Sequence, residues 1–194
     1  EGLVNAFCHR DYSILQMVRI VIDDDGLTIN SPGGFIEGVT LDNLLTVEPH
    51  GRNPALADAF KRIGLAERTG RGIDRIFEGS MIYGRPLPDY SESTPRNVRL
   101  FIQRAEPDLP FMKMLLDEEN KTGRTFPTNS LLILSTLRTN RRLSLKDIEE
   151  ATHISRMRLK ASLERLVESG LIEGLGSASG REYILSAETY WKQG

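Results

Sequence analysis

The chain has 194 residues, of which 39% are hydrophobic, and its formal net charge is −2. This length suits one large or two small domains with ordinary apolar cores. The sequence contains no run of about 18 apolar residues that could span a bilayer and no signal peptide, which argues against a membrane protein or a secreted one. Cys8 is the single cysteine, so no internal disulfide can form, and we expect a cytoplasmic protein.

The charge is divided unevenly along the chain. Residues 1–107 hold 12 Lys and Arg against 15 Asp and Glu, whereas residues 128–194 hold 10 against 8. A mildly basic C-terminal part permits nucleic-acid binding without requiring it. The chain also begins without Met, inside a stretch with helical periodicity, so we expect a fragment that lacks elements before Glu1.

The opening stretch, residues 1–13, carries the main chemical pattern. Glu1, Asn5 and His9 recur every four residues, so a helix would line a carboxylate, a carboxamide and an imidazole along one face. A carboxylate can take a proton from water, and an amide oxygen suits Mg²⁺ beside a phosphate chain. The same spacing also fits a plain amphipathic helix whose polar face meets water.

A β-hairpin is predicted next, because residues 17–22 and 27–30 are β-rich and flank a turn of three aspartates and a glycine. The following Ser-Pro-Gly-Gly segment, residues 31–34, is expected to end the sheet. Its glycines, Gly33 and Gly34, would let backbone amides approach a phosphate or a nucleobase edge, and a plain turn is the alternative.

Two helices and a strand are predicted after the hairpin. Asn-Pro begins a helix over residues 53–64, and a glycine turn at Gly70 and Gly72 opens a second helix over residues 74–83. Free amides at a helix N-terminus attract anions, so this turn is a second place where phosphate could be held; a glycine C-cap before a new helix is the alternative. Residues 97–104 alternate as a strand.

Taken together, these motifs resemble those of the "RecG C-terminal-like" transcriptional regulators. The shared pieces occur in a similar order: Glu1-x-x-x-Asn5-Ala6, His9-Arg10-Asp11-Tyr12-Ser13, Pro32-Gly33-Gly34, Arg52-Asn53-Pro54 and Gly70-x-Gly72-Ile73. The domain of that family is similar to the GHKL ATPases, the superfamily of gyrase, Hsp90, histidine kinases and MutL. The resemblance implies an α+β protein whose residues 1–107 form a GHKL-like (Bergerat-type) α/β sandwich, truncated at its N-terminus.

The resemblance also implies a site for ATP and Mg²⁺. Glu1 would be catalytic and polarise the attacking water, and Asn5 would be the Mg²⁺ ligand. The residues implied to bind the cofactor are Asn5, His9, Gly33, Gly34, Gly70 and Gly72. The superfamily reads adenine with an acid, whereas the matching residues 30–34 contain none, so weakened or lost nucleotide binding is the alternative.

The last third of the chain has a different pattern. Residues 108–127 are rich in Pro and charge and are interpreted as a connector, and a helix at the short apolar patch of residues 111–116 is the alternative within it. Short helices are predicted over residues 131–137, 144–151 and 155–169, followed by two strands around a loop rich in Gly and Ser. This order resembles a winged helix-turn-helix over residues 128–194, whose third helix would enter the major groove of double-stranded DNA.

The third predicted helix has leucines on one side and a cationic face on the other. The predicted DNA-binding set is Arg156, Arg158, Lys160 and Arg165, with Arg181 at the hairpin contacting phosphate or the minor groove. Arg158 is the expected base reader because Arg can bind guanine in bidentate fashion. A protein-interaction module is the alternative for this domain.

Three functions fit these patterns. The first is a DNA-binding transcriptional regulator whose GHKL-like domain senses a nucleotide or holds subunits together. The second is an active Mg²⁺-dependent ATPase, and the third is a non-binding scaffold with a protein-interaction winged helix. Because two-fold DNA sites usually need two-fold proteins, we expect a homodimer.

Overall fold

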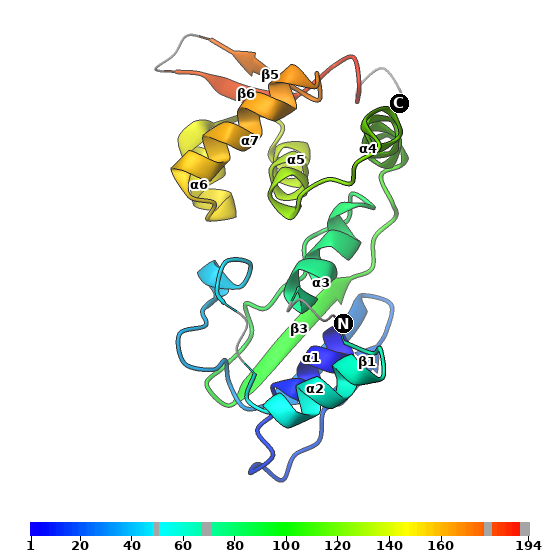
Figure 1. Cartoon of the computed structure of the whole chain (residues 1–194), viewed down its shortest axis with the longest axis vertical. Helices are drawn as coiled ribbons and strands as arrows, with labels where there is room; N and C mark the ends of the chain where they lie inside the picture. The colour runs from blue at the N-terminus through cyan, green and yellow to red at the C-terminus, as the bar shows by residue number, and fades with distance from the viewer. Residues whose placement is uncertain (49–50, 67–70, 177–179, 191–194) are drawn as a thin grey trace. The chain divides into compact units, whose positions relative to one another are not determined.

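The computed structural model describes residues 1–48, 51–66, 71–176 and 180–190. These residues form two compact units, and Figure 1 shows the elements of each. The first unit consists of Glu1–Ser80 and Pro86–Glu106, and the second consists of Met81–Arg85 and Pro107–Gly194. The protein is of the α+β class, as expected, because each unit combines a small antiparallel sheet with helices.

The sheet of the first unit has three antiparallel strands in the order β1-β2-β3, namely β1 (Arg19–Ile22), β2 (Gly26–Pro32) and β3 (Asn97–Gln103). The predicted hairpin is confirmed by the pairing of β1 with β2. The expectation that residues 31–34 end the sheet is wrong for Ser31 and Pro32, which pair with β3 inside β2. The ladder accommodates Pro32 because this residue forms its last pair, opposite Asn97.

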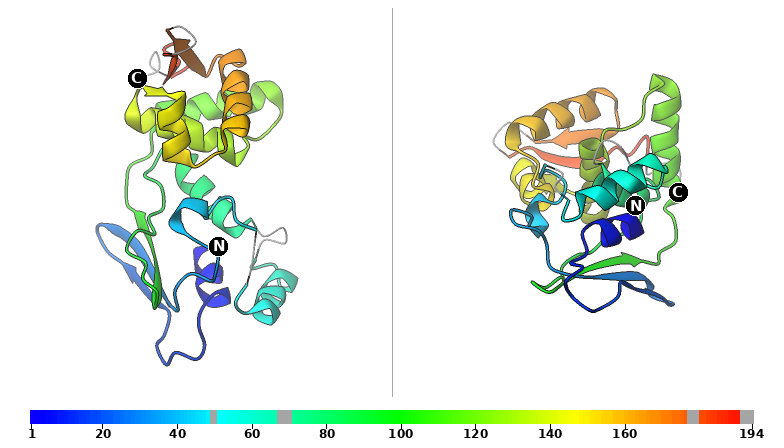
Figure 2. Two further views of the ribbon diagram at one scale, coloured as in Figure 1. Left: turned by 90° about the vertical axis from the view of Figure 1, so that its left-hand side faces the viewer. Right: turned by 60° about the horizontal axis from the view of Figure 1, so that its bottom comes forward.

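Three α-helices belong mainly to the first unit: α1 (Gly2–Cys8), α2 (Pro54–Arg62) and α3 (Gly72–Met81). A 3-10 turn, η1, covers Leu41–Asn43. Helix α1 packs on β2 and contacts α2, and Figure 2 shows it along one face of the sheet. Helix α1 is shorter than the opening stretch of 13 residues suggested, because His9 forms its C-cap and a turn follows.

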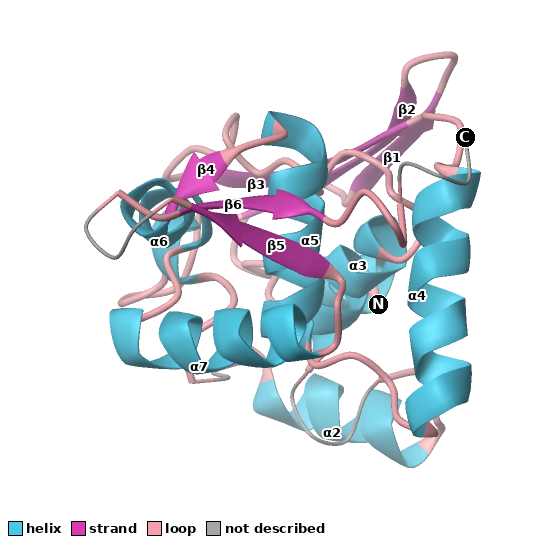
Figure 3. Cartoon of the chain, turned by 90° about the horizontal axis from the view of Figure 1, so that it is seen from above, coloured by secondary structure: helices cyan, strands magenta, loops and turns pink. Residues whose placement is uncertain are grey.

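The second unit contains four helices and a second three-stranded sheet, whose strand order is β4-β6-β5 (Figure 3). Its elements are α4 (Leu109–Thr122), α5 (Thr128–Asn140), β4 (Leu143–Ser144), α6 (Leu145–Thr152), α7 (Arg156–Glu168), β5 (Ile172–Leu175) and β6 (Glu182–Leu185). Residues 130–137 of α5 are all buried, so this helix forms the centre of the unit.

The predicted connector over residues 108–127 is corrected by helix α4. Asp108 caps this helix by accepting a hydrogen bond from the Phe111 amide at 3.0 Å, and Gly123 ends it with φ +66°. Phe111 and Met114 are almost fully buried, so α4 belongs to the core of the second unit. The prolines near residue 108 misled the interpretation, because proline in the first turn of a helix removes no intrahelical hydrogen bond.

Helices α6 and α7 begin and end within one residue of the predicted ranges, whereas α5 is longer than predicted at both ends and β4 was not predicted. Ser144 and Asp147 form a capping box at the start of α6, because each side chain accepts a hydrogen bond from the other residue's amide. On α7, Leu159 and Leu163 are 0% and 1% exposed, which confirms the predicted inward face of this helix. Packing of that face on α5 leaves the opposite face of α7 in solvent.

Candidate ligand pocket and nucleic-acid interface

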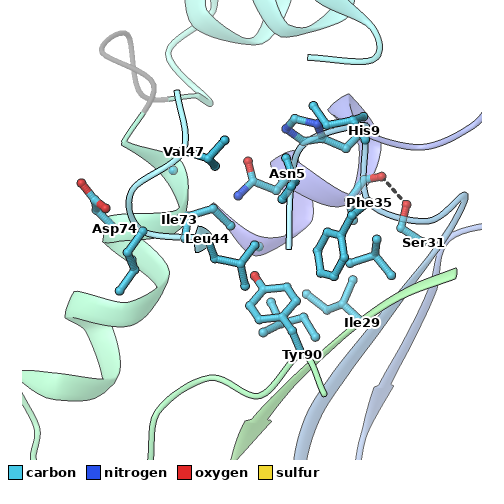
Figure 4. A pocket seen from close by; sticks show the side chains of 18 of the residues that line it. Asn5, His9, Ile29, Ser31, Phe35, Leu44, Val47, Ile73, Asp74 and Tyr90 are labelled. Carbon is cyan, nitrogen blue, oxygen red and sulfur yellow. Dashed lines mark hydrogen bonds between the residues drawn. The ribbon is translucent and has the colours of Figure 1, made fainter. Parts of the chain in front are cut away.

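Helix α1 directs its polar stripe toward a cavity beside the first sheet. Asn5 and His9 both line this cavity, and Figure 4 shows the Asn5 carboxamide reaching into it. Glu1 is exposed at the N-cap, with its carboxylate beside Gly72 at the start of α3. A Cβ atom placed on Gly72 would lie 3.0 Å from Asn5 Oδ1 and 3.3 Å from Glu1 Oε2. The fold therefore brings Gly72, which is distant in sequence, next to Glu1 and Asn5.

Side chains from distant segments satisfy the last carbonyl groups of α1. Buried Ser31 donates its hydroxyl to Ala6 O at 2.7 Å. Asn53 donates its amide to Cys8 O at 2.9 Å and to Arg10 O at 2.8 Å, and Arg52 donates to His9 O at 2.7 Å. Because the last carbonyls of a helix have no intrahelical partner, these bonds fix the end of α1 and the direction of its polar stripe. Asn53 starts α2 without capping it.

The four predicted glycines have different surroundings. Gly34 lines the cavity, and a Cβ atom on it would lie 2.6 Å from the carbonyl oxygen of Pro95. Gly33, with φ +96°, faces Arg52 and Asp11 and does not line the cavity. The prediction that Gly33 borders a ligand is thus not supported by its position, because Arg52 fills the space beside it. Gly70 lies outside the described residues.

The cavity has a volume of about 310 Å³ and lies within the first unit. Apolar side chains form most of its wall, from the sheet, from the loop after β2 and from the start of α3: Ile29, Phe35, Leu44, Val47, Ile73 and Leu100. The polar side chains in the wall are Asn5, His9, Ser31, Glu48, Arg71 and Asp74. Such a wall, largely apolar with a few polar groups, is typical of a small-molecule site.

Tyr90 forms one end of the cavity. Its ring stacks on Phe77 at a centroid distance of 6.4 Å and meets the ring of Phe35 at 6.2 Å. Burial raises the pKa of the Tyr90 phenol, so this group is neutral across the physiological range. Figure 4 shows its hydroxyl directed toward the cavity, which gives the apolar end a single polar group.

Two ionic groups of the wall, Arg71 and Asp74, are paired with each other, and Arg71 also pairs with Glu78 on α3. Arg71 Nε lies 3.1 Å from Asp74 Oδ2, and Arg71 Nη2 lies 2.7 Å from Glu78 Oε1. Burial, and then the nearby Arg52 guanidinium, lower the pKa of His9, so its imidazole is neutral at pH 7. Arg52 itself is behind the wall, where it donates to the Gly34 carbonyl at 3.0 Å.

In the second unit, the outer face of α7 is cationic. The four predicted residues of this helix, Arg156, Arg158, Lys160 and Arg165, are all exposed, which agrees with their proposed contact with DNA. Two of them already have partners, because Arg156 pairs with Glu149 at 3.2 Å and Arg165 donates to the Ala161 carbonyl at 3.1 Å. Met157, 80% exposed, adds an apolar side chain to the same surface.

Arg181 lies on the β5–β6 hairpin, just before β6. Its guanidinium is 5.6 Å from the centre of the Tyr183 ring and covers Gly174 on β5, where any side chain would collide with it. Gly174 and Tyr183 are paired across the two strands, so together they hold the cation on one face of the hairpin. Residues 177–179 of the hairpin loop lie outside the described part of the chain.

Comparison with known proteins finds one family match in each of the two units. Residues 16–102 match the family model described as "Putative ATP-dependent DNA helicase recG C-terminal", and residues 128–173 match the model "Winged helix-turn-helix DNA-binding". The chain combines a RecG C-terminal-like domain with a winged helix-turn-helix. The family resemblance and the architecture expected from the sequence are thereby confirmed.

A solved structure, that of the DIP2311 protein from Corynebacterium diphtheriae, is similar to the chain with a TM-score of 0.77 and 20% identity. The match covers 98% of this chain but only 39% of that protein, and at this identity it shows a shared fold alone. No curated protein matches the chain.

The RecG C-terminal-like domain fits ATP and Mg²⁺ only in part. Glu1 and Asn5 lie together, as a metal ligand and a base for water would. Residues 30–34, the stretch expected to recognise the base, contain no acid, and the Ser31 hydroxyl among them donates to the Ala6 carbonyl. At the expected phosphate end the described wall offers one guanidinium, that of Arg71, already paired with two carboxylates. Among the described residues, the wall thus offers no acid to the base within residues 30–34 and a single, already paired guanidinium to the phosphates.

Several residues of the cavity wall and of the α7 surface were not predicted from the sequence. Arg71 and Asp74 are three apart at the start of α3, a spacing that signals an ion pair on a helix. Phe35 and Tyr90 could not be found from local spacing, because they come from loops that meet only in the fold. Glu149 pairs with Arg156 across the turn between α6 and α7, which the sequence alone did not indicate.

The described residues contain no group of three or more His, Cys, Asp or Glu side chains that could hold a metal ion. Every described helix is also too short or too polar to cross a membrane.

Proposed function

We propose that this protein is a transcriptional regulator that binds double-stranded DNA through its winged helix-turn-helix and responds to a small molecule in the cavity of its RecG C-terminal-like domain. The exposed cationic face of α7 is the observation that carries the proposal. In a winged helix-turn-helix, such a helix contacts base edges in the major groove. Arg158 has the role of base reader, and Arg165 and Lys160 contact phosphates.

Arg181 supports the same proposal from a second element. Its stacking on Tyr183 and its place over Gly174 hold the guanidinium on the face of the hairpin, where it can reach a phosphate or the minor groove. Arg156 contributes less, because its charge is compensated by Glu149. Action in the cytoplasm as a homodimer completes the proposal, since two identical recognition helices match the two-fold symmetry of regulatory DNA sites.

Fluorescence anisotropy with genomic DNA fragments at several salt concentrations tests DNA binding. We expect affinity to fall steeply with salt and to fall further in Arg158→Ala and Arg165→Ala. Each lost phosphate contact should reduce the salt slope by about 0.9. Arg124→Ala is the matched control, because Arg124 is exposed in the same unit but outside α7 and the hairpin. Absent or salt-independent binding, or equal losses in the control, would refute DNA binding by this face.

The neighbouring Glu1 and Asn5 side chains favour a second candidate, an Mg²⁺-dependent ATPase. This activity predicts steady phosphate release from ATP that requires Mg²⁺ and falls at least tenfold in Glu1→Gln. Phosphate release at the level of buffer in the unchanged protein would exclude it. Light scattering on the same samples measures the oligomeric state. The proposed regulator should be a dimer.

A further inference from the structure

Strand β1 is an edge of the first sheet. It pairs with β2 along one side, and in the described ranges no strand or bridge runs along its other side. The opposite edge of the sheet, β3, is partly covered, because Asp89 and Phe101 exchange two main-chain hydrogen bonds of 2.8 Å. An open edge presents unpaired N–H and C=O groups that can bind a further strand.

The main-chain groups of Ile20 and Ile22 point away from β2. The Asp23 amide donates to the Gly26 carbonyl at 3.1 Å, so the groups of Asp23 point toward β2. In an antiparallel strand these groups alternate between the two sides from one residue to the next. The groups of Val21 therefore also point toward β2, and those of Ile20 and Ile22 form the open edge.

The side chains at this edge are apolar and exposed. Ile20 and Ile22 are 47% and 80% exposed. Ile20 lies directly opposite Ile29, which is 3% exposed and lies beneath Gly2 of α1. The two exposed side chains therefore continue the apolar face of the sheet beyond the cover that α1 provides. Apolar surface beside an open strand edge marks a site for another strand.

The sequence of this edge is complementary to itself. Residues 19–23 read Arg-Ile-Val-Ile-Asp, which is symmetric about Val21 except that the two ends carry opposite charges. Antiparallel pairing of two copies about Val21 places Ile20 opposite Ile22 of the second copy, and Arg19 opposite Asp23, twice in each dimer. The two pairs of isoleucines are also the residues whose main-chain groups point outward, so this register satisfies the open edge.

The charged ends of the strand are available for such pairs. In the part of the chain that the structure describes, Arg19 makes no ion pair. Asp23 accepts hydrogen bonds from the Asp25 and Gly26 amides at 3.0 and 3.1 Å, both through Oδ1. The other carboxylate oxygen, Oδ2, is left to accept from an arginine of a second copy.

We propose that two copies of this chain associate through β1, paired antiparallel about Val21, so that their three-stranded sheets join into one sheet of six strands. The inference rests on the homodimer of the proposed function and names its surface, and it does not depend on DNA binding by α7. Two strands of this length bury little surface, so the dimer should dissociate on dilution.

Charge exchange at the two ends of the strand tests the pairing. Arg19→Asp and Asp23→Arg should each weaken self-association about tenfold or more, because two repulsive pairs replace two attractive ones. Sedimentation velocity over a range of protein concentrations measures this loss. A mixture of the two variants should associate again as a heterodimer, because each arginine then faces an aspartate. Misfolding of either variant would not be repaired by mixing.

A second variant leaves the turn after β1 intact. Ile22→Lys changes an exposed side chain of the monomer but places a cation against Ile20 of the second copy, so it should weaken association about tenfold or more. Ile63→Lys is the matched control, because Ile63 is 67% exposed at the end of α2, and association should stay unchanged.

Disulfide cross-linking tests the register. Val21 would face Val21 of the second copy in a non-hydrogen-bonded pair, where the Cα atoms are about 4.5 Å apart and a disulfide can form. Val21→Cys should therefore give a covalent dimer on mild oxidation. Ile20→Cys should not, because Ile20 faces Ile22 instead of itself. The unchanged protein, whose single Cys8 is buried, gives the background.

Three outcomes would overturn the proposal: association that Arg19→Asp and Ile22→Lys leave unchanged, no heterodimer in the mixture, or equal cross-linking of Val21→Cys and Ile20→Cys. A dimer that ignores these variants would refute the β1 surface alone and leave the proposed homodimer standing. DNA anisotropy on the same preparations separates the other proposal. Association through β1 without DNA binding would refute the regulator alone.

Discussion

Asn53→Ala tests whether the Arg-Asn-Pro segment is a structural clamp on α1. Asn53 lies 45 residues beyond Cys8, yet its amide donates to both Cys8 O and Arg10 O. Alanine removes both bonds and leaves two half-buried carbonyls without these donors. If the segment instead contacted a ligand, its loss would change binding without changing the stability of α1.

The expected size of the effect follows from those two bonds. A typical intramolecular hydrogen bond contributes about 1 kcal/mol net, so Asn53→Ala should lower the free energy of unfolding of the first unit by about 2 kcal/mol. For a unit of about 100 residues this corresponds to a fall in Tm of about 8 °C. Asn53→Asp should cost more, because a carboxylate would face two carbonyl oxygens.

Hydrogen exchange measured by mass spectrometry assigns the effect to its place in the chain. Amides of α1 should exchange faster in Asn53→Ala, while amides of α5 in the second unit should keep their protection. Asp58→Ala, on the exposed side of α2, is the control and should change neither. Unchanged protection of α1 in Asn53→Ala would show that the clamp argument is wrong.

Three further predictions address the cavity and the hairpin. Because the pKa of His9 is lowered in the folded protein, its imidazole takes up a proton at a higher pH in the unfolded state than in the folded state. Stability should therefore fall as the pH drops below about 6.5. His9→Gln should flatten this part of the pH dependence, measured by urea unfolding. Gly34→Ala should be strongly destabilising because its Cβ would meet main-chain atoms, whereas Gly72→Ala should be mild because its Cβ meets only side-chain ends, which thermal unfolding will compare. Gly174→Ala should displace the Arg181 guanidinium and weaken DNA binding about threefold to tenfold without lowering Tm, as anisotropy and calorimetry will show.

Gly180→Ala is the control for the hairpin, because no atom lies within 4 Å of its added Cβ and DNA binding should stay unchanged. Equal loss of DNA binding in both hairpin variants would refute a specific place for Arg181. A pH profile that stays curved in His9→Gln would assign the effect to another group. Equal stability of Gly34→Ala and Gly72→Ala would contradict the described packing of both glycines.

Local sequence signals were reliable where one element contains the whole pattern. The four-residue spacing of Glu1, Asn5 and His9 correctly placed a polar stripe on a helix, since helical geometry alone sets that alignment. The predicted start of a helix at residue 144 likewise agrees with α6, whose N-cap is Ser144. Signals that depend on a single residue type were weaker, since the content of Pro and charge favoured a connector where α4 forms a helix that is partly buried.

The site was only partly predictable, because its wall comes from segments that do not share a local pattern. Gly33 and Gly34 are adjacent in sequence, but one faces Arg52 and the other faces the cavity. Phe35 and Tyr90 meet through a contact between two loops. No periodicity relates such pairs, so the sequence could not predict which side chains form the apolar part of the wall.

The sequence by itself determined the polar face of α1 and the cationic face of α7, since each depends on the spacing of neighbours along one element. The tertiary structure decided which side chains and main-chain atoms from other segments lie next to these elements. The bonds from Asn53 to the end of α1 and the place of Arg181 over Gly174 depend on which backbones the packed core brings together. That choice is made by burial summed over the whole core, which no local window of the sequence contains.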